Sequence, residues 1–399
     1  MIDGVGDSFY NKEKYSAVSW ERERDSMKWV HLSDLHIGKI VNGYSMLEEQ
    51  RDIFEKILEI IEQEAPDAVL LSGDIYDKAA PSAEAMALFD WLLTALAAEG
   101  RAVLLISGNH DSAERLSVGA RLIQKSRVYV APVYRGELET VTLRDTWGEV
   151  DFVLLPFVKP AMVRAVFPGE EIADTDQAVR TALQGIGADP SRRRVLLCHQ
   201  FVQGAASCDS EEKHIGGLDA VGGSAFDGFD YVALGHLHNP QKVGQERIRY
   251  CGTPLKYSFS EVHSKKSVTV VSLQEKGNLQ IRTVPLQPRH DLQRFRGRFE
   301  ELLKMGSEDY VQLTLTDETE IPHAYHRLRE KYPRIMVLDY DNTRTRTRAD
   351  FSGAEKMRGK SEIQLFSELF RQQNGREMDE RQTQYMEKLL RELKGGEEE

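Results

Sequence analysis

The 399-residue sequence is poor in cysteine and has no long apolar run. Its three cysteines, Cys198, Cys208 and Cys251, are odd in number and lack CxxC spacing. This argues against a disulfide framework and against a thiolate zinc site. No stretch approaches about 18 consecutive apolar residues, so the sequence predicts no transmembrane helix and no membrane partner. The first 27 residues have no apolar core, unlike a secretory signal, and with the unpaired cysteines they indicate a cytoplasmic protein.

An excess of positive charge is also missing. The net charge is -12, from 52 Lys or Arg and 64 Asp or Glu. This balance disfavours nucleic-acid binding, since phosphate contacts need basic side chains, but a local basic surface or a basic partner subunit could supply them. The hydrophobic share of 41% and the charged share of 29% are typical of globular proteins and exclude wholesale disorder. At about 100–200 residues per domain, the length predicts two to four domains.

Short apolar runs alternate with amphipathic patterns over much of the chain. Strands are predicted at Lys28–Leu32, Ala68–Leu71, Ala102–Ile106, Phe152–Leu155, Val195–Leu197 and Tyr231–Leu234, and helices at Met46–Ile61 and Glu84–Leu96. This alternation predicts an α/β domain with a largely buried sheet. Further β-rich segments at 129–143 and 248–284 indicate a second sheet packed on the first.

Changes in the pattern divide the chain into five segments. We expect a disordered N-terminal extension at 1–27, a main domain at 28–286, a small α+β domain at 287–342, a linker at 343–360 and paired helices at 361–395. Within the α+β domain, the pattern predicts a helix at Leu292–Met305, a strand at Tyr310–Thr316, a helix at His323–Tyr332 and a strand at Ile335–Tyr340.

Histidine, aspartate and asparagine gather directly after the predicted strands of the main domain. The clusters are Asp34 and His36 in SDLHIG; Asp74 and Asp77 in GDIYD; Asn109, His110 and Asp111 in GNHD; His199 in LLCHQF; and His236 and His238 in GHLH. Since ligands bind outside the carboxyl ends of the strands in α/β sheets, we expect the clusters to meet at one rim. The neighbouring Gly73, Gly108 and Gly235 permit tight turns there.

Seven of these side chains offer nitrogen or oxygen donors to metal ions. They are the carboxylates Asp34 and Asp74, the imidazoles His36, His199, His236 and His238, and the Asn109 amide. Seven donors exceed the capacity of one ion and suit two, and a set without thiolate favours Mn, Fe or Zn over Ca. The central Asp74 could bridge the ions at about 3.5–4 Å. Such a pair activates a water and stabilises charge on a phosphate, so the sequence predicts phosphoester hydrolysis.

Three further side chains have predicted roles beside the ions. His110 follows Asn109 directly and cannot easily bind the same ion, so we predict that it protonates the leaving oxygen as a general acid. Asp77 and Asp111 either bond imidazoles and fix their tautomers or serve as ordinary turn residues. A single DxH or GNHD arises by chance, but five clusters in consistent positions favour the dimetal interpretation.

The ordered motifs DxH, GDxxD, GNH(D/E), a solitary His and GHxH resemble those of the calcineurin-like metallophosphoesterase superfamily. Within it, the chain resembles the SbcD family of bacterial nuclease subunits. Lys78–Ser82 follows Asp77 where protein phosphatases have Arg-Gly, and GHLHNPQ leads into CGTPLKYSFSE at Cys251–Glu261. Three features depart from the family pattern. Leu35 replaces an aromatic residue, the acidic segment 205–217 matches only loosely, and the first 27 residues have no counterpart.

The resemblance implies a two-sheet α/β/β/α sandwich with a small α+β cap domain and C-terminal helices. It also implies two divalent ions, Mn(II) in this family, with His110 near the scissile phosphate. One ion would be bound by Asp34, His36, Asp74 and His238, and the other by Asp74, Asn109, His199 and His236.

The same resemblance implies the partners and the reaction. The partner would be an SbcC-like coiled-coil ATPase, in a heterotetramer that contains a homodimer of this chain. Together they would cleave double-stranded DNA ends, hairpins and single strands, as an exonuclease and endonuclease of DNA repair, recombination and replication.

Two other functions remain open. A stand-alone phosphomonoesterase or cyclic-nucleotide phosphodiesterase could use the same core, but such enzymes usually end after the sandwich, whereas roughly 110 residues follow Pro285. A non-catalytic scaffold is disfavoured by the intact ligand set and His110.

The C-terminal helices have apolar faces, formed by Ile363, Phe366, Leu369 and Phe370 and by Tyr385, Met386, Leu389, Leu390 and Leu393. These faces either pack on the chain's own α+β domain or bind the partner. The polar linker Thr343–Gly353 favours binding to the partner.

Overall fold

The computed structural model describes residues 25–187, 189, 191–209, 211, 220–343, 345, 361–374 and 376–394. The chain divides into two compact units, Met1–Leu292 and Gln293–Glu399. Most of the predicted N-terminal extension, and of the predicted linker at 343–360, lies outside the described residues.

The first unit contains two six-stranded sheets. The first sheet has the order β14-β13-β1-β4-β5-β6, formed by β1 (Met27–Leu32), β4 (Ala68–Ser72), β5 (Ala102–Ile106), β6 (Val128–Ala131), β13 (Ser267–Leu273) and β14 (Leu279–Pro285). β1, β4, β5 and β6 are parallel, and β13 and β14 pair antiparallel beside β1. The helices α1 (Leu47–Glu64) and α2 (Ala83–Leu96) connect the parallel strands. In α1, Ile53, Ile57 and Ile61 are buried at helical spacing, so one face of the helix packs inward.

The second sheet is also mixed and is formed later in the chain. Its order is β11-β12-β10-β9-β8-β7, formed by β7 (Glu139–Asp145), β8 (Gly148–Leu155), β9 (Arg193–His199), β10 (Tyr231–Gly235), β11 (Gln241–Val243) and β12 (Gln245–Tyr250). The four central strands are parallel, and β7 and β11 are antiparallel edges. The helices α5 (Pro160–Val166) and α6 (Thr175–Leu183) accompany this sheet.

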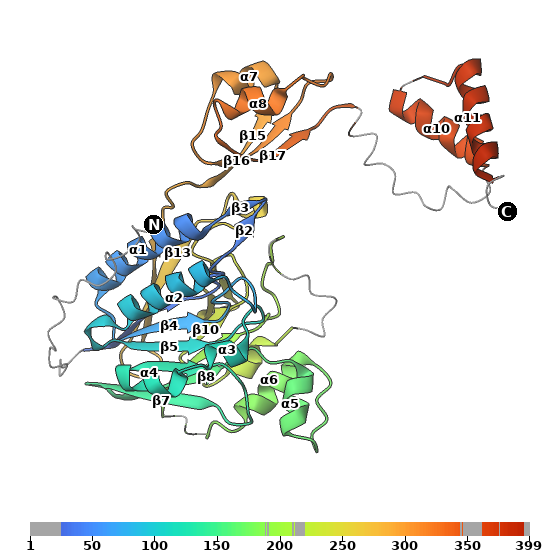
Figure 1. Ribbon diagram of the computed structural model, residues 1–399. Helices are drawn as coiled ribbons and strands as arrows, with labels where there is room; N and C mark the ends of the chain where they lie inside the picture. The colour runs from blue at the N-terminus through green and yellow to red at the C-terminus, as the bar shows by residue number, and fades with distance from the viewer. Residues whose placement is uncertain are drawn as a thin grey trace, which may run out of the picture. The chain divides into compact units, whose positions relative to one another are not determined.

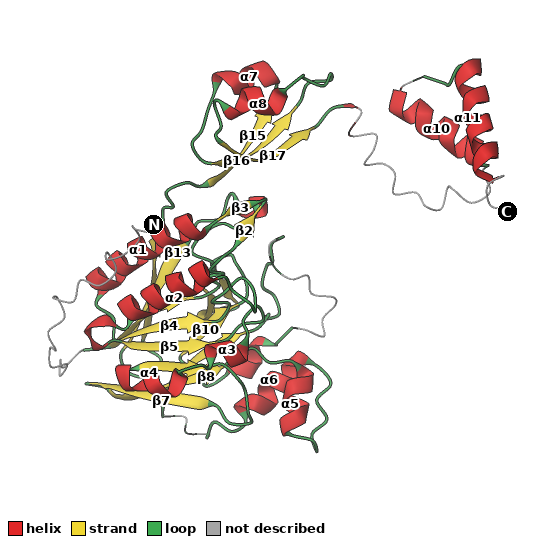
Figure 2. Cartoon of the chain, viewed as in Figure 1, coloured by secondary structure: helices red, strands yellow, loops and turns green. Residues whose placement is uncertain are grey.

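One apolar core lies between the two sheets. Trp29 of β1 meets Phe152 of β8 edge to face, with ring centroids 5.7 Å apart. Along β9, Val195 and Leu197 belong to this core, whereas Leu196 belongs to a second core shared with α5 and α6. This alternation is the two-residue period of a strand buried on both faces. The layers are thus helix, sheet, sheet, helix (Figures 1 and 2), and the predicted α/β/β/α sandwich is confirmed.

Short elements complete the first unit. They are the hairpin β2 (Ile40–Val41) and β3 (Tyr44–Ser45), the helices α3 (Ala113–Leu116) and α4 (Ala120–Ile123), and the 3-10 turns η1 (Ala98–Gly100), η2 (Gln124–Ser126), η4 (Gly223–Phe226) and η5 (Phe259–Glu261). In the described part of the chain, no helix has the length and apolar character needed to cross a membrane.

The second unit begins with a three-stranded sheet. In chain order its elements are β15 (Leu292–Gly297), α7 (Phe299–Lys304), β16 (Tyr310–Leu315), α8 (Ala324–Arg329) and β17 (Arg334–Tyr340), followed by α10 (Glu362–Asn374) and α11 (Glu380–Lys394). The helix predicted over Leu292–Met305 is wrong in its first half, which is the strand β15. Leu292, Phe295 and Phe299 imitate helical spacing, but Arg294 and Arg296 alternate outward around Phe295 in the manner of a strand.

Candidate metal centre

All five predicted clusters lie at the carboxyl ends of strands, and both sheets contribute. Asp34 and His36 follow β1, Asp74 follows β4, Asn109 and His110 follow β5, His199 ends β9, and His236 and His238 follow β10. The seven predicted donors meet at one rim, where the ends of the two sheets approach each other.

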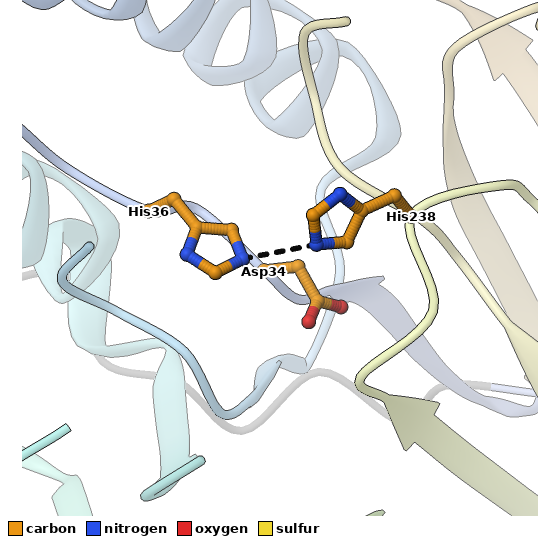
Figure 3. A group of neighbouring side chains, drawn as sticks. All are labelled: Asp34, His36 and His238. Atoms are coloured by element: carbon orange, nitrogen blue, oxygen red, sulfur yellow. Dashed lines mark hydrogen bonds between the residues drawn. The ribbon is translucent and has the colours of Figure 1, made fainter. Parts of the chain in front are cut away.

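Asp34, His36 and His238 form one group of potential ligands. Their donor atoms all lie within 4.8 Å of one another, and all three side chains are buried. The Nε2 atoms of His36 and His238 are 3.1 Å apart and face each other beside the Asp34 carboxylate (Figure 3). Ring nitrogens and a carboxylate that converge in this way can bind one ion.

A second group lies beside the first. Donor atoms of Asp34, Asp74 and His199 also lie within 4.8 Å of one another. The Oδ1 atom of Asn109 is 3.1 Å from His199 Nε2 and 3.0 Å from His236 Nδ1. An amide oxygen between two imidazoles, next to carboxylates, is a second convergent donor set.

The Asp74 carboxylate lies between the two groups. Its Oδ2 atom is 3.4 Å from His199 Nε2 and 3.7 Å from His36 Nε2, so one oxygen faces an imidazole of each group. Its Oδ1 atom accepts a hydrogen bond from the main-chain N–H of His110 at 2.9 Å. A carboxylate in this position could bridge two ions.

The protonation of the site reflects how deeply these groups are buried. Burial raises the pKa of Asp34 to about 6. Burial also acts to raise the pKa of Asp74, but the charge and hydrogen bond of His199 outweigh it and hold that pKa well below its usual range. In the same pair, burial acts to lower the pKa of His199, and the charge of Asp74 raises it to about 9. The two shifts have one cause, since the Asp74 carboxylate and the His199 imidazole each stabilise the charged form of the other.

Four of the potential ligands have an unusual backbone conformation. The φ angles of Asp34, His36, Asp74 and His236 are 53°, 45°, 50° and 106°. Residues with a side chain rarely adopt positive φ, and such strain gathers at functional sites. Main-chain hydrogen bonds hold two of them, from Asp34 N to Gly73 O and from His36 N to Asp74 O, both at 3.0 Å.

Two glycines allow the ligand loops to approach closely. A Cβ atom on Gly235 would lie 1.9 Å from Ser72 O, and one on Gly108 would lie 2.0 Å from Asp74 Oδ1. Gly235 belongs to β10 and Ser72 to β4, so the missing side chain lets the ends of the two sheets touch.

His110 lies beside the potential ligands, with its ring centroid 4.8 Å from that of His36. Its Nδ1 atom is 3.0 Å from the main-chain oxygen of Asp77. A carbonyl can only accept, so Nδ1 carries a proton and Nε2 is left for a substrate. The Asp77 carboxylate lies 2.7 Å from Lys39 Nζ and 3.8 Å from His36 Nδ1.

Of the two alternatives for Asp111, an imidazole partner or an ordinary turn residue, the structure shows the contacts of a turn residue. Its carboxylate accepts hydrogen bonds from the main-chain N–H groups of Ile75 at 3.1 Å, Tyr76 at 3.0 Å and Gly108 at 2.9 Å. Burial, followed by the charge of Asp74, raises its pKa to about 6. Asp111 therefore joins the loop after β4 to the loop after β5, because its carboxylate accepts from main-chain N–H groups of both loops.

Sequence reasoning missed a buried glutamine that supports the first loop. Gln50 of α1 donates from Nε2 to the main-chain oxygens of Leu35 at 3.2 Å and His36 at 2.8 Å, and accepts from Gly38 N at 3.0 Å. The hydroxyl of Tyr257 donates to Leu35 O at 2.7 Å. A glutamine inside an amphipathic helix gives no sequence signal for such a role.

Comparison with known proteins identifies two families along the chain. Residues 27–240 match the calcineurin-like phosphoesterase family, and residues 288–374 match the type 5 capsule protein repressor C-terminal domain, SbcD_C. The SbcD component of nuclease SbcCD from Staphylococcus epidermidis is 33% identical over 321 residues, which cover 78% of this chain and 85% of that protein. Its counterpart in Staphylococcus saprophyticus is 31% identical over 321 residues, which cover 78% of this chain and 84% of that protein.

A solved dimetal phosphatase from Danio rerio aligns with 65% of this chain and 99% of its own, at 12% identity and a TM-score of 0.37, a likeness too weak to inform fold or function. The two family matches and the two staphylococcal relatives agree with the motifs and with the sandwich. The chain therefore belongs to the calcineurin-like phosphoesterases and, within them, to the SbcD family of nuclease subunits.

Proposed function

We propose that this chain is the nuclease subunit of an SbcCD-type complex and that it hydrolyses phosphodiester bonds of DNA with two divalent ions. The observation that carries the proposal is the position of Asp74 Oδ2, between an imidazole of each donor group. The relatives that are nucleases by name support the reaction, and the name SbcCD supports a complex with an SbcC protein.

The donor set fits two divalent ions, since it offers seven nitrogen and oxygen atoms and no thiolate. We assign Asp34, His36, Asp74 and His238 to one ion and Asp74, Asn109, His199 and His236 to the other. Bound there, the ions would supply Lewis acidity and a water of lowered pKa. Among the ions that this set accepts we propose Mn(II), which the resemblance to the SbcD family implies.

The protein's own groups move a proton and hold the geometry. His110 enters this step as the imidazolium, donates the Nε2 proton to the leaving oxygen and becomes the neutral imidazole. The Asp77 carbonyl accepts a hydrogen bond from Nδ1–H throughout and fixes the ring. The hydrogen bond from His110 N to Asp74 Oδ1 holds His110 beside the carboxylate that we propose bridges the ions. With DNA as substrate, we place the protein in the cytoplasm, at the nucleoid.

The C-terminal helices are the proposed docking site for the coiled-coil ATPase. α10 and α11 contact each other, and Phe366 and Leu389 are only partly buried. Leu369 remains 40% exposed and Tyr385 66% exposed. Apolar faces of this kind bind amphipathic partner helices. We propose further that two copies of the chain assemble with two copies of the ATPase.

One assay separates the proposal from its main alternative. Hairpin and single-stranded DNA are incubated with the chain and Mn(II), with and without the coiled-coil ATPase, beside p-nitrophenyl phosphate. A nuclease of this family cleaves the DNA, and the partner changes the products. Hydrolysis of p-nitrophenyl phosphate without DNA cleavage would instead establish a stand-alone phosphomonoesterase.

A further inference from the structure

A buried ion pair outside the predicted ligand set lies directly behind the first donor group. Glu261 ends the turn η5 and Lys266 precedes β13, and their side chains are 0% and 3% exposed. Burying two charges is costly, and a buried pair seldom stabilises a protein more than apolar residues would. The role of the pair is therefore to be found in its contacts.

Those contacts converge on His238. The ammonium of Lys266 donates to Glu261 Oε2, to Thr253 Oγ1 at 2.7 Å and to the main-chain oxygen of His238 at 2.8 Å. These three bonds use all of its protons. The other carboxylate oxygen of Glu261 accepts from Tyr257 N at 3.2 Å and lies 3.9 Å from His238 Nδ1. The ion pair thus approaches both the backbone and the ring of one potential ligand.

The remaining atoms of His238 complete the arrangement. Its main-chain N–H donates to Glu211 Oε1 at 2.5 Å. Its Nε2 atom faces His36 Nε2 in the donor group (Figure 3). A carboxylate on the Nδ1 side favours a proton on Nδ1 and leaves the Nε2 lone pair for an ion, as in carboxylate–histidine–metal triads.

The neighbouring imidazole of the same group has a similar environment. His36 Nδ1 lies 3.8 Å from the Asp77 carboxylate, which is itself paired with Lys39 at 2.7 Å. Both imidazoles of this group therefore have a lysine-paired carboxylate behind Nδ1. By contrast, His199 Nδ1 in the second group donates to a carbonyl, Ser72 O, at 2.8 Å.

We infer that Glu261, oriented by Lys266, is a positioning residue that fixes the tautomer and direction of His238 toward the ion bound with Asp34 and His36. The inference rests on the proposed function, since it assumes a metal ion in the first donor group. In this role Glu261 acts through His238 and does not itself bind the ion or the substrate.

The variant Glu261→Gln keeps the shape of the side chain and removes its charge. Loss of such a partner typically weakens metal affinity about 10–100-fold. We expect that loss for one of the two Mn(II) ions, measured by electron paramagnetic resonance titration of the metal-free protein. The second ion should bind nearly as in the wild type.

The matched control is a second deeply buried ion pair, Asp145 with Arg193, whose side chains are 2% and 4% exposed. Arg193 begins β9, and His199 ends it, so this pair lies at the opposite end of a strand from the metal centre. Asp145→Asn also leaves a buried cation, Arg193, without its carboxylate partner. It should lower stability, as Glu261→Gln does, while both Mn(II) affinities remain unchanged.

A double variant separates positioning from stability. Glu261→Gln with Lys266→Met also removes the Lys266 ammonium, which Glu261→Gln alone leaves buried without its carboxylate partner. The double variant should therefore be more stable than Glu261→Gln alone, and it should still bind one ion weakly. Wild-type affinities for both ions in Glu261→Gln would overturn the inference. So would recovery of both affinities along with stability in the double variant. If the wild type itself binds no pair of ions, the proposed function fails instead.

Discussion

Replacement of Gly235 by alanine tests how the two sheets build one centre. The added Cβ would lie 1.9 Å from Ser72 O and 2.6 Å from His199 Nδ1. Carbon does not approach such atoms within 3.0 Å, so the end of β10 or of β4 must move by about 1 Å (3.0 minus 1.9) in a closely packed interior. His236 follows Gly235 directly, and Asp74 lies two residues after Ser72, so the shift separates donors that come from different sheets.

The expected energies allow Gly235→Ala to fold and still lose metal affinity and activity. Overpacking typically costs about 1–3 kcal/mol, which is less than the roughly 5–15 kcal/mol that stabilises a native protein. A functional site tolerates displacements of only about 0.5 Å, and a misplacement of 1 Å can cost about 10²-fold in rate. Gly235→Ala should therefore remain folded, bind Mn(II) more weakly and cleave DNA at least about 100-fold more slowly.

The control is Gly223→Ala, in the turn η4, where an added Cβ would meet nothing within 4 Å. Both variants are compared with the wild type by equilibrium unfolding, Mn(II) titration and Mn(II)-dependent DNA cleavage. If Gly235→Ala matches Gly223→Ala in metal affinity and rate, the close contact of the sheets does not set the geometry of the centre.

Four further predictions follow from the site and the C-terminal helices. His110→Ala should keep its bound metal and lose about 10²–10⁴-fold in cleavage rate, because it removes only the proton donor; loss of metal would make it a ligand. Asp74→Ala should lose metal stoichiometry in elemental analysis, since both donor groups share this carboxylate, and two ions per chain would refute the bridge. The pKa of His199 in the metal-free protein is raised from 6.5 to about 9. Protonation of His199 therefore adds to the free energy of unfolding fully below about pH 6.5, and this contribution is lost as the pH rises through 9. Free energies of unfolding that stay constant over this window would contradict the assignment. Phe366→Glu with Leu389→Glu should abolish association with the coiled-coil ATPase, because each buried side chain contributes about 1.5–3 kcal/mol; co-elution at sub-micromolar concentration would exclude these helices as the main dock.

The donor set could be predicted because its signal is local. Each of the seven residues lies at a strand end or within four residues after it. Parallel strands bring such positions to one edge by topology alone. The structure places all seven together, from β1, β4 and β5 in one sheet and β9 and β10 in the other. Their roles as ligands, and that of His110 as an acid, remain predictions.

The supporting residues could not be predicted, because their partners are distant in sequence. Gln50 bonds the loop at Leu35 and His36 from inside a helix, and Lys266 reaches the main chain of His238, 28 residues away. A polar residue in a helix or turn has the same sequence appearance whether it faces water or a ligand loop. The strand β15 was missed for a related reason, since its alternation is too short to outweigh an apolar spacing that imitates a helix.

The strained ligand loops are held by the pairing of the strands that carry them. Asp34, His36 and Asp74 have positive φ angles. Their loops are joined by main-chain hydrogen bonds between neighbouring strand ends, which include Ile37 N to Ile75 O at 2.9 Å. Such bonds form only once β1 and β4 are paired, so packing of the sheets offsets the strain. The potential ligands therefore converge because the strands of the sheet are paired, and not because each loop by itself prefers a conformation with positive φ.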